Sequence, residues 1–461
     1  MAHVTGCEAV IGWASPARFR RVCPLLERGA DGRWCCSVNA AEVRPFWGRA
    51  TAAVLATVAG LYLAGTLTLF GLLRARGYTI GLRQVAWPPA LRVALPRAQA
   101  ALFLRQARAA YQDGHINEAL VALQSAWRDD PSNYATGLLL AQFLQAADPH
   151  GAGLIYARLR AEHPEKRPEV AQSWFYSLLT HGDFRAVATL AREELGARPD
   201  EVAWLHALIF SCRQTGDAAL LETLAATPDG LLAAVRGLAA TEAAALRGQL
   251  AGEELRAQLR TWPAANAPAY VWSWQIDRLL AGGWTEDALA GLVAGRGRMA
   301  GRDVAPLLLR AYAMAGDEAT RAQELKTFIA ARPRLNDAEL TMLCAHLIRY
   351  PQADALAALT AAWRRNAGTP DTARLPLALS VFWAAAAGGD DMARREIADW
   401  MRVTAGGKLP ATLDAFAEVL RNQKLEQPVT RLLPTLPPLP LEVVYALLVR
   451  NINKKQGRGD I

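Results

Sequence analysis

The stretch ALFLRQARAAYQDGHINEALVALQSAWRDDPSN, from Ala101 to Asn133, decides the fold of this chain. Two runs of helix-forming residues meet at Gly114, and the stretch closes at Pro131. Glycine adopts the left-handed conformation of a tight turn at little cost, whereas proline cannot continue a helix. The small side chains of Ala119 and Ala126 on the second run let two helices approach closely. The stretch therefore predicts two antiparallel helices joined by a turn at Gly114.

The same glycine turn recurs along the chain at a near-constant spacing. It stands at Gly114, Gly182, Gly216, Gly283, Gly316 and Gly389. Subtracting these numbers gives steps of 68, 34, 67, 33 and 73 residues, four of which are one or two units of about 34. In three copies a proline follows the glycine by 17 residues, at Pro131, Pro199 and Pro333. A period of roughly 20–50 residues is typical of a stacked repeat architecture.

These features resemble the tetratricopeptide repeat (TPR), in which a small residue closes the first helix, two alanines pack the pair and a proline ends the unit. The resemblance covers residues 100–408, with units starting near 100, 134, 168, 202, 236, 269, 302, 336 and 375. It implies an all-α, TPR-like α-solenoid, a right-handed superhelix of helix pairs whose groove commonly holds a segment of a partner protein. Residues 409–461 are interpreted as a C-terminal cap with a basic tail, with helices at Leu413–Leu420 and Leu441–Leu448.

Residues 50–73 form a run of 24 positions without a charge. About 20 apolar residues suffice for a helix to cross the hydrocarbon core of a membrane. A signal peptide would have a shorter apolar core nearer the N-terminus. The run therefore predicts one transmembrane helix, followed by a juxtamembrane linker over residues 74–99. Small residues at Ala56, Gly60 and Ala64 permit close helix approach, which leaves a homodimer through this anchor open.

The orientation of the anchor rests on the arginines around it. Their numbers before and after the apolar run are nearly balanced, so the positive-inside rule discriminates little between the two orientations. A short basic N-terminal segment before a long body favours an N-terminus inside the cell. We therefore interpret the chain as a single-pass protein of a bacterial inner membrane, with its repeats outside the cytoplasm.

Four of the six cysteines stand before the apolar run, at Cys7, Cys23, Cys35 and Cys36. The phrases CPLL from Cys23 and CSVN from Cys36 each resemble half of a zinc ribbon. Tetrahedral zinc needs four ligands, and Leu26 and Asn39 replace the second cysteine of each half. Residues 1–49 thus resemble a degenerate zinc ribbon for which we expect no metal. Reduced thiols and disulfides both stay open, since the choice depends on the compartment.

Motifs that carry chemistry are missing from the sequence. It contains no H-E-x-x-H and no G-x-S-x-G, and the glycine-rich stretch Gly295–Gly301 follows a helical pattern instead of the strand that a phosphate-binding loop needs. The net charge of +8 is spread along the chain without an aromatic-basic module, which argues against nucleic acid as a partner. We expect no cofactor and no catalytic residues.

Several aromatic residues lie close together in the sequence around residue 272. Trp and Tyr are over-represented at binding hot spots, so Trp272, Trp274 and Trp284 are candidate partner-binding residues, with core packing as the alternative. The leading hypothesis is a membrane-anchored, non-catalytic scaffold that binds a partner protein through its helical-repeat groove. The alternative is an assembly or export factor that regulates a membrane enzyme or secretion complex of the cell envelope. An enzyme with a helical toroid fold is a third hypothesis.

Overall fold

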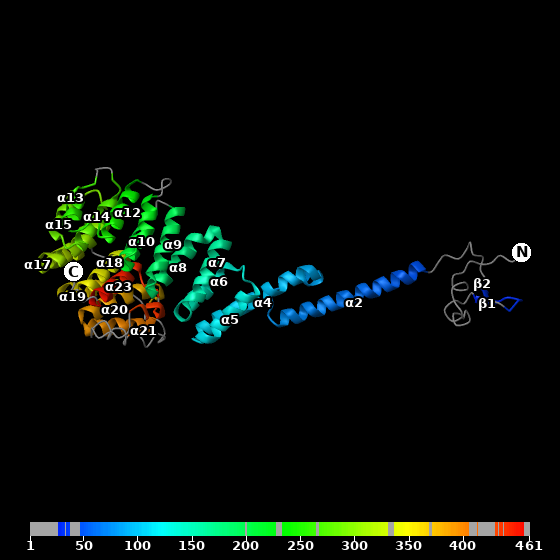
Figure 1. Ribbon diagram of the computed structural model, residues 1–461. Helices are drawn as coiled ribbons and strands as arrows, with labels where there is room; N and C mark the ends of the chain where they lie inside the picture. Colours follow the sequence, from blue (N-terminus) through cyan, green and yellow to red (C-terminus); the bar gives the residue numbers. More distant parts are fainter. Residues whose placement is uncertain are drawn as a thin grey trace. The chain divides into compact units, whose positions relative to one another are not determined.

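Helices make up nearly all of the regular structure in the computed structural model (Figure 1). The chain divides into two units, Met1–Leu102 and Phe103–Ile461. The structure describes residues 26–32, 34–36, 47–198, 201–226, 233–263, 267–330, 336–367, 371–404, 413, 429–431, 433–436 and 438–455. Over these ranges the expected all-α class holds for the second unit.

The first unit departs from the all-α expectation by one short hairpin. Strands β1 (Leu26–Arg28) and β2 (Trp34–Cys36) pair antiparallel, with Leu26 opposite Cys36. This register joins the two zinc-ribbon-like phrases, because Leu26 ends the first phrase and Cys36 begins the second. It also pairs a cysteine with a leucine, which cannot ligate a metal. Cys7 and Cys23 lie outside the described residues.

Helix α2 (Trp47–Ala75) contains the predicted transmembrane run. Within the described residues it is the one helix long and apolar enough to cross a membrane, over Ala50–Ala75. Only 6% of its most apolar window is buried, so its apolar side chains face outward instead of into a protein core. Length and composition thus agree with the predicted span.

The predicted linker over residues 74–99 is largely helical. It contains α3 (Leu82–Ala86) and the first half of α4 (Pro88–Gln112). Gly77 has a φ of 86° and reverses the chain after α2. Proline at the first positions of α4 suits a helix start, where its missing N–H would be unpaired in any case. The juxtamembrane linker therefore contains helices, and its first prolines begin a helix and do not interrupt one.

The described residues of the second unit form successive helix pairs. The first pair includes α4, which begins in the first unit. After α4 and α5 (Ile116–Asp129), the pairs are α6–α7 (Tyr134–Ala147, Pro149–Glu162), α8–α9 (Arg167–His181, Phe184–Ala197), α10–α11 (Val202–Thr215, Ala219–Ala226), α12–α13 (Ala233–Leu246, Gly252–Arg260), α14–α15 (Ala269–Ala281, Thr285–Ala294), α16–α17 (Gly301–Ala315, Glu318–Ala330), α18–α19 (Asp337–Arg349, Ala353–Ala367) and α20–α21 (Leu375–Gly388, Asp391–Thr404). Short 3₁₀ turns, η2 (Pro164–Lys166) and η3 (Thr372–Arg374), precede α8 and α20. From α6 onward, each first helix begins within three residues of the predicted start of its unit.

The turn within a pair follows from two adjacent residues. All six periodic glycines have a positive φ, between 68° and 83°, as their predicted role in left-handed turns requires. At four of these turns the next residue is aspartate, and its carboxylate accepts a hydrogen bond from a backbone N–H in the first turn of the second helix. These capping residues are Asp183, Asp217, Asp317 and Asp390. Glycine thus ends one helix and aspartate begins the next.

The packing of the pairs agrees with the roles inferred for the small residues. Ala119 and Ala126 of α5 are fully buried. Pro131 lies in the turn between α5 and α6, whereas Pro199 and Pro333 lie outside the described residues. First helices also contact the first helix of the next pair: α6 with α8, α10 with α12, α12 with α14, α14 with α16, α16 with α18, and α18 with α20. One apolar core therefore runs from α8 through the later pairs.

The C-terminal segment packs against helices that lie far earlier in the chain. It consists of η4 (Val429–Arg431), η5 (Leu433–Thr435) and α23 (Leu441–Lys455). The backbone N–H of Leu439 donates a 2.7 Å hydrogen bond to the Tyr176 hydroxyl on α8. The Tyr445 ring meets the Phe210 ring of α10 edge to face at 4.7 Å between centroids.

The same segment also reaches the late pairs. The Arg450 guanidinium donates to the backbone carbonyl oxygens of Ile348 on α18 and Ala387 on α20. Val443, Val444 and Leu447 are fully buried. The segment expected to cap the last pair therefore bridges early and late pairs and belongs to the core that they share.

Candidate functional site

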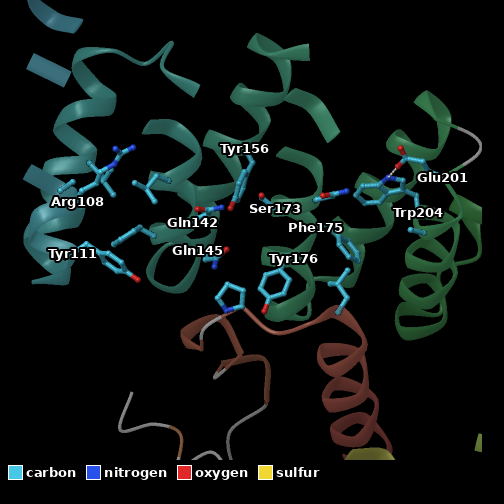
Figure 2. Close-up of a pocket in the computed structure, with 18 residues that line it drawn as sticks. Arg108, Tyr111, Gln142, Gln145, Tyr156, Ser173, Phe175, Tyr176, Glu201 and Trp204 are labelled. Carbon is cyan, nitrogen blue, oxygen red and sulfur yellow. Dashed lines mark hydrogen bonds between the residues drawn. The ribbon is translucent and has the colours of Figure 1, made fainter. Parts of the chain in front are cut away.

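A cavity in the second unit lies among its first helices (Figure 2). Its volume is about 1000 Å³. We call it the N-terminal groove. Its lining comes from α4, α5, α6, α7, α8, the start of α10 and the C-terminal segment, and comprises Ala107, Arg108, Tyr111, Leu123, Leu139, Gln142, Phe143, Gln145, Tyr156, Gln172, Ser173, Phe175, Tyr176, Glu201, Ala203, Trp204, Pro438 and Leu441.

Helical spacing explains why these side chains converge. On α8, Gln172, Phe175 and Tyr176 are three and four positions apart, which puts them on one face of the helix. Gln142 and Gln145 repeat the three-residue spacing on α6. Because α6 packs against α8, these faces form neighbouring parts of one wall.

Aromatic rings form much of this wall. Tyr111 of α4 meets Phe143 of α6 edge to face, with ring centroids 5.2 Å apart. Phe175 meets Trp204 in the same manner at 5.5 Å. Such pairs contribute about 0.5–1.5 kcal/mol beyond the area that they bury. The rings are therefore held in place before any ligand arrives.

The Tyr156 side chain is the unusual polar group of the groove. It is fully buried, and its hydroxyl has no hydrogen-bond partner among the described residues. Burial raises the pKa of Tyr156 above its usual range, so the hydroxyl stays a neutral donor. A buried polar group without a partner costs about 1–3 kcal/mol.

Charged groups lie at the two ends of the lining. Glu201 accepts a 2.9 Å hydrogen bond from the Trp204 indole N–H, marked in Figure 2, and it also pairs with Arg198. Arg108 on α4 is exposed. The middle of the groove carries amide, hydroxyl and aromatic groups, which suit hydrogen bonding and apolar contact more than acid–base chemistry.

The C-terminal segment closes one side of the groove. Pro438 and Leu441 belong to the lining, and the Tyr176 hydroxyl is held by the N–H of Leu439. Burial raises the pKa of Tyr176, and the hydrogen bond from Leu439 opposes that rise. The sequence could not have placed Pro438 and Leu441 in this site, because 263 positions separate Tyr176 from Leu439.

The tryptophans proposed from sequence do not line this groove. Trp272 and Trp274 are only 2% and 8% exposed, which favours core packing, the alternative to partner binding, for both side chains. Trp272 stacks on Trp262 with centroids 6.2 Å apart, and the Trp274 indole donates a 2.9 Å hydrogen bond to Glu242. Helix α14 contacts α12, α13, α15 and α16, so its different faces are covered by protein.

Trp284 has a different place from its two neighbours. It is half-buried at the N-terminus of α15, against the turn that contains Gly282. A Cβ at Gly282 would lie 2.5 Å from the Trp284 ring. The ring therefore packs on its own turn, and its role in binding stays a prediction.

A partly buried ion network crosses four first helices. Arg213 of α10 pairs with Glu242 of α12 and, at 2.6 Å, with Asp277 of α14, and Asp277 also pairs with Arg310 of α16. Burial alone would raise the pKa of Asp277, but the charges of Arg310 and Arg213 outweigh it and lower that pKa below its usual range. Asp277 and Arg310 are 33 residues apart, so the repeat period was the signal that could have found this pair.

The structure offers little for metal or thiol chemistry in the part that it describes. No group of three or more His, Cys, Asp or Glu side chains there could hold a metal ion. Cys212 and Cys344 are buried free thiols, and burial raises the pKa of Cys212 to about 12. Such thiols behave as small apolar groups.

No protein-family model matches the chain, and no curated protein matches it at a significant level. Function therefore has to follow from the geometry of this chain.

Proposed function

We propose that the helix pairs form a TPR-like α-solenoid and that the protein is a membrane-anchored scaffold, which binds a segment of a partner protein in the N-terminal groove without catalysing a reaction. The regular unit starts, the left-handed glycines and the contacts between successive first helices support the solenoid. Helix α2 supports the anchor.

The lining of the N-terminal groove carries this proposal. Its volume of about 1000 Å³ is at the upper end of small-molecule pockets. Aromatic side chains such as Tyr111 and Phe143 can cover apolar side chains of a peptide. The amides of Gln142, Gln145 and Gln172 offer both donors and acceptors to a peptide backbone.

The C-terminal segment decides which part of the repeat surface a partner can use. Val443, Val444 and Leu447 are fully buried between early and late pairs. Burying three such side chains contributes roughly 5–9 kcal/mol, comparable to the whole stability of many domains. A partner would have to displace α23 to reach the surface beneath it, so the groove near α4, α6 and α8 is the accessible part.

Site-specific photocrosslinking in intact membranes tests the proposal. A photoreactive residue replaces Gln142 or Gln172 in the full chain. The control replaces Leu154, which is 62% exposed on α7 and outside the groove lining. We expect one defined protein adduct from both groove positions and none from position 154.

A second variant, Phe143→Ala, should abolish that adduct while the chain stays folded. An adduct that forms equally from position 154, or that survives Phe143→Ala, would refute the groove as the binding site. The identity of the adduct separates a general scaffold from an assembly or export factor, because only the latter would yield an envelope enzyme or a secretion component.

A further inference from the structure

The segment that follows α2 carries charged side chains of positive sign only. Residues 74–97, which we call the juxtamembrane segment, contain five arginines and no acidic residue. The absence of acidic residues extends over the whole stretch 47–112. A solvated protein surface usually carries both acidic and basic side chains, as the helix pairs of the second unit do. The segment therefore carries a local positive charge that its own sequence does not neutralise.

The five arginines share the outer surface with apolar side chains. Arg74, Arg76, Arg83, Arg92 and Arg97 are all exposed. Among them Trp87 is 64% exposed, Val93 56% and Leu82 42%. The opposite side is apolar and buried: Val85 and Ala98 pack with Leu73 and Ile80 in one cluster. Exposed tryptophan, aliphatic and arginine side chains together are the composition of a membrane interface.

The segment is held against the transmembrane helix. The Tyr62 hydroxyl of α2 donates a hydrogen bond to the backbone carbonyl of Ala86, at the end of α3. Tyr62 precedes Leu73 by 11 residues, or about 17 Å of helix. Helix α3 therefore doubles back beside α2. When α2 crosses a bilayer, α3 and the start of α4 lie in the leaflet in which α2 ends.

We propose that the juxtamembrane segment is a lipid-binding surface that enters this leaflet and binds the headgroups of anionic phospholipids through its arginines. Trp87, Leu82 and Val93 contact the acyl chains and the interface. The long arginine side chains extend toward the phosphates, as such side chains do near helix ends. Each arginine near an anionic surface contributes about a fivefold preference, equivalent to about 1 kcal/mol. The occupant is a lipid surface and not a protein, because the charge pattern continues directly from the membrane span.

Lipid retention by the full chain tests this inference. The protein is reconstituted in nanodiscs that contain phosphatidylcholine and phosphatidylglycerol at 7:3, and the lipids retained after mild detergent release are counted by native mass spectrometry. The variant R83Q/R92Q/R97Q is compared with R185Q/R296Q/R395Q, whose three arginines are exposed in the repeat body. We expect a preference for phosphatidylglycerol in the wild type and in the second variant, and a preference at least fivefold lower in the first, which keeps only Arg74 and Arg76 of the five arginines.

A spin label gives a second readout, which does not depend on charge. Val93→Cys is labelled in a background with the four N-terminal cysteines replaced by serine, and Leu154→Cys serves as a water-exposed control. We expect the label at position 93 to be more accessible to oxygen than to a water-soluble nickel complex, and the reverse at position 154. Equal lipid ratios in the two arginine variants, or a label at 93 that behaves like the one at 154, would overturn the proposal.

Discussion

Replacing Phe210 and Tyr445 by alanine, singly and together, tests whether the C-terminal helix packs onto the early repeats. The two rings lie 4.7 Å apart, edge to face, on α10 and α23. Each single replacement removes a half-buried aromatic ring. Removal of a fully buried ring costs about 3–5 kcal/mol of stability, so each single variant should lose less than that. The interaction between the rings alone is worth about 0.5–1.5 kcal/mol. The double variant should therefore lose less stability than the sum of the single variants, by that amount.

Thermal unfolding in detergent measures this coupling. For a unit of roughly 360 residues, the unfolding entropy of about 2.1 cal/mol/K per residue makes 1 kcal/mol equivalent to a Tm change of about 1.3 °C. The control pair is Leu123→Ala with Tyr445→Ala, because Leu123 belongs to a separate apolar cluster. Additive Tm changes in both pairs, within about 0.3 °C, would refute the packing of α23 on α10.

Three further predictions concern the turns, the ion network and the thiols. Gly182→Ala should destabilise more than Gly216→Ala in thermal unfolding: both have positive φ, but only at 182 would a Cβ lie 2.7 Å from Thr430. Asp277→Asn should lower the free energy of unfolding at neutral pH. Because the native pKa of Asp277 is depressed, this difference should shrink as the pH falls below about 4. Cys212 should react with a thiol reagent at pH 8 only on unfolding, because burial raises its pKa to about 12, and equal rates in native and unfolded protein would contradict its burial.

The sequence by itself determined the helix pairs, their turns and the apolar helix. Each of these features depends on residues within one unit of about 34 positions. Gly182 ends α8 with a left-handed residue and Asp183 caps α9, so this turn needs no distant contact to form. The apolar run likewise depends only on its own length and composition. Local conformational preference and local periodicity are enough to predict such elements.

The tertiary structure alone decided where surfaces are covered and where they stay open. Trp272 and Trp274 point in different directions on α14, as their spacing predicts, but packing against four neighbouring helices buries both. One side of the N-terminal groove is closed because the C-terminal segment returns to α8, where the N–H of Leu439 donates a hydrogen bond to the Tyr176 hydroxyl across 263 residues. That return depends on how the helix pairs pack on one another between α8 and α23. No local pattern contains this packing, so the open groove could be found only once the chain was folded.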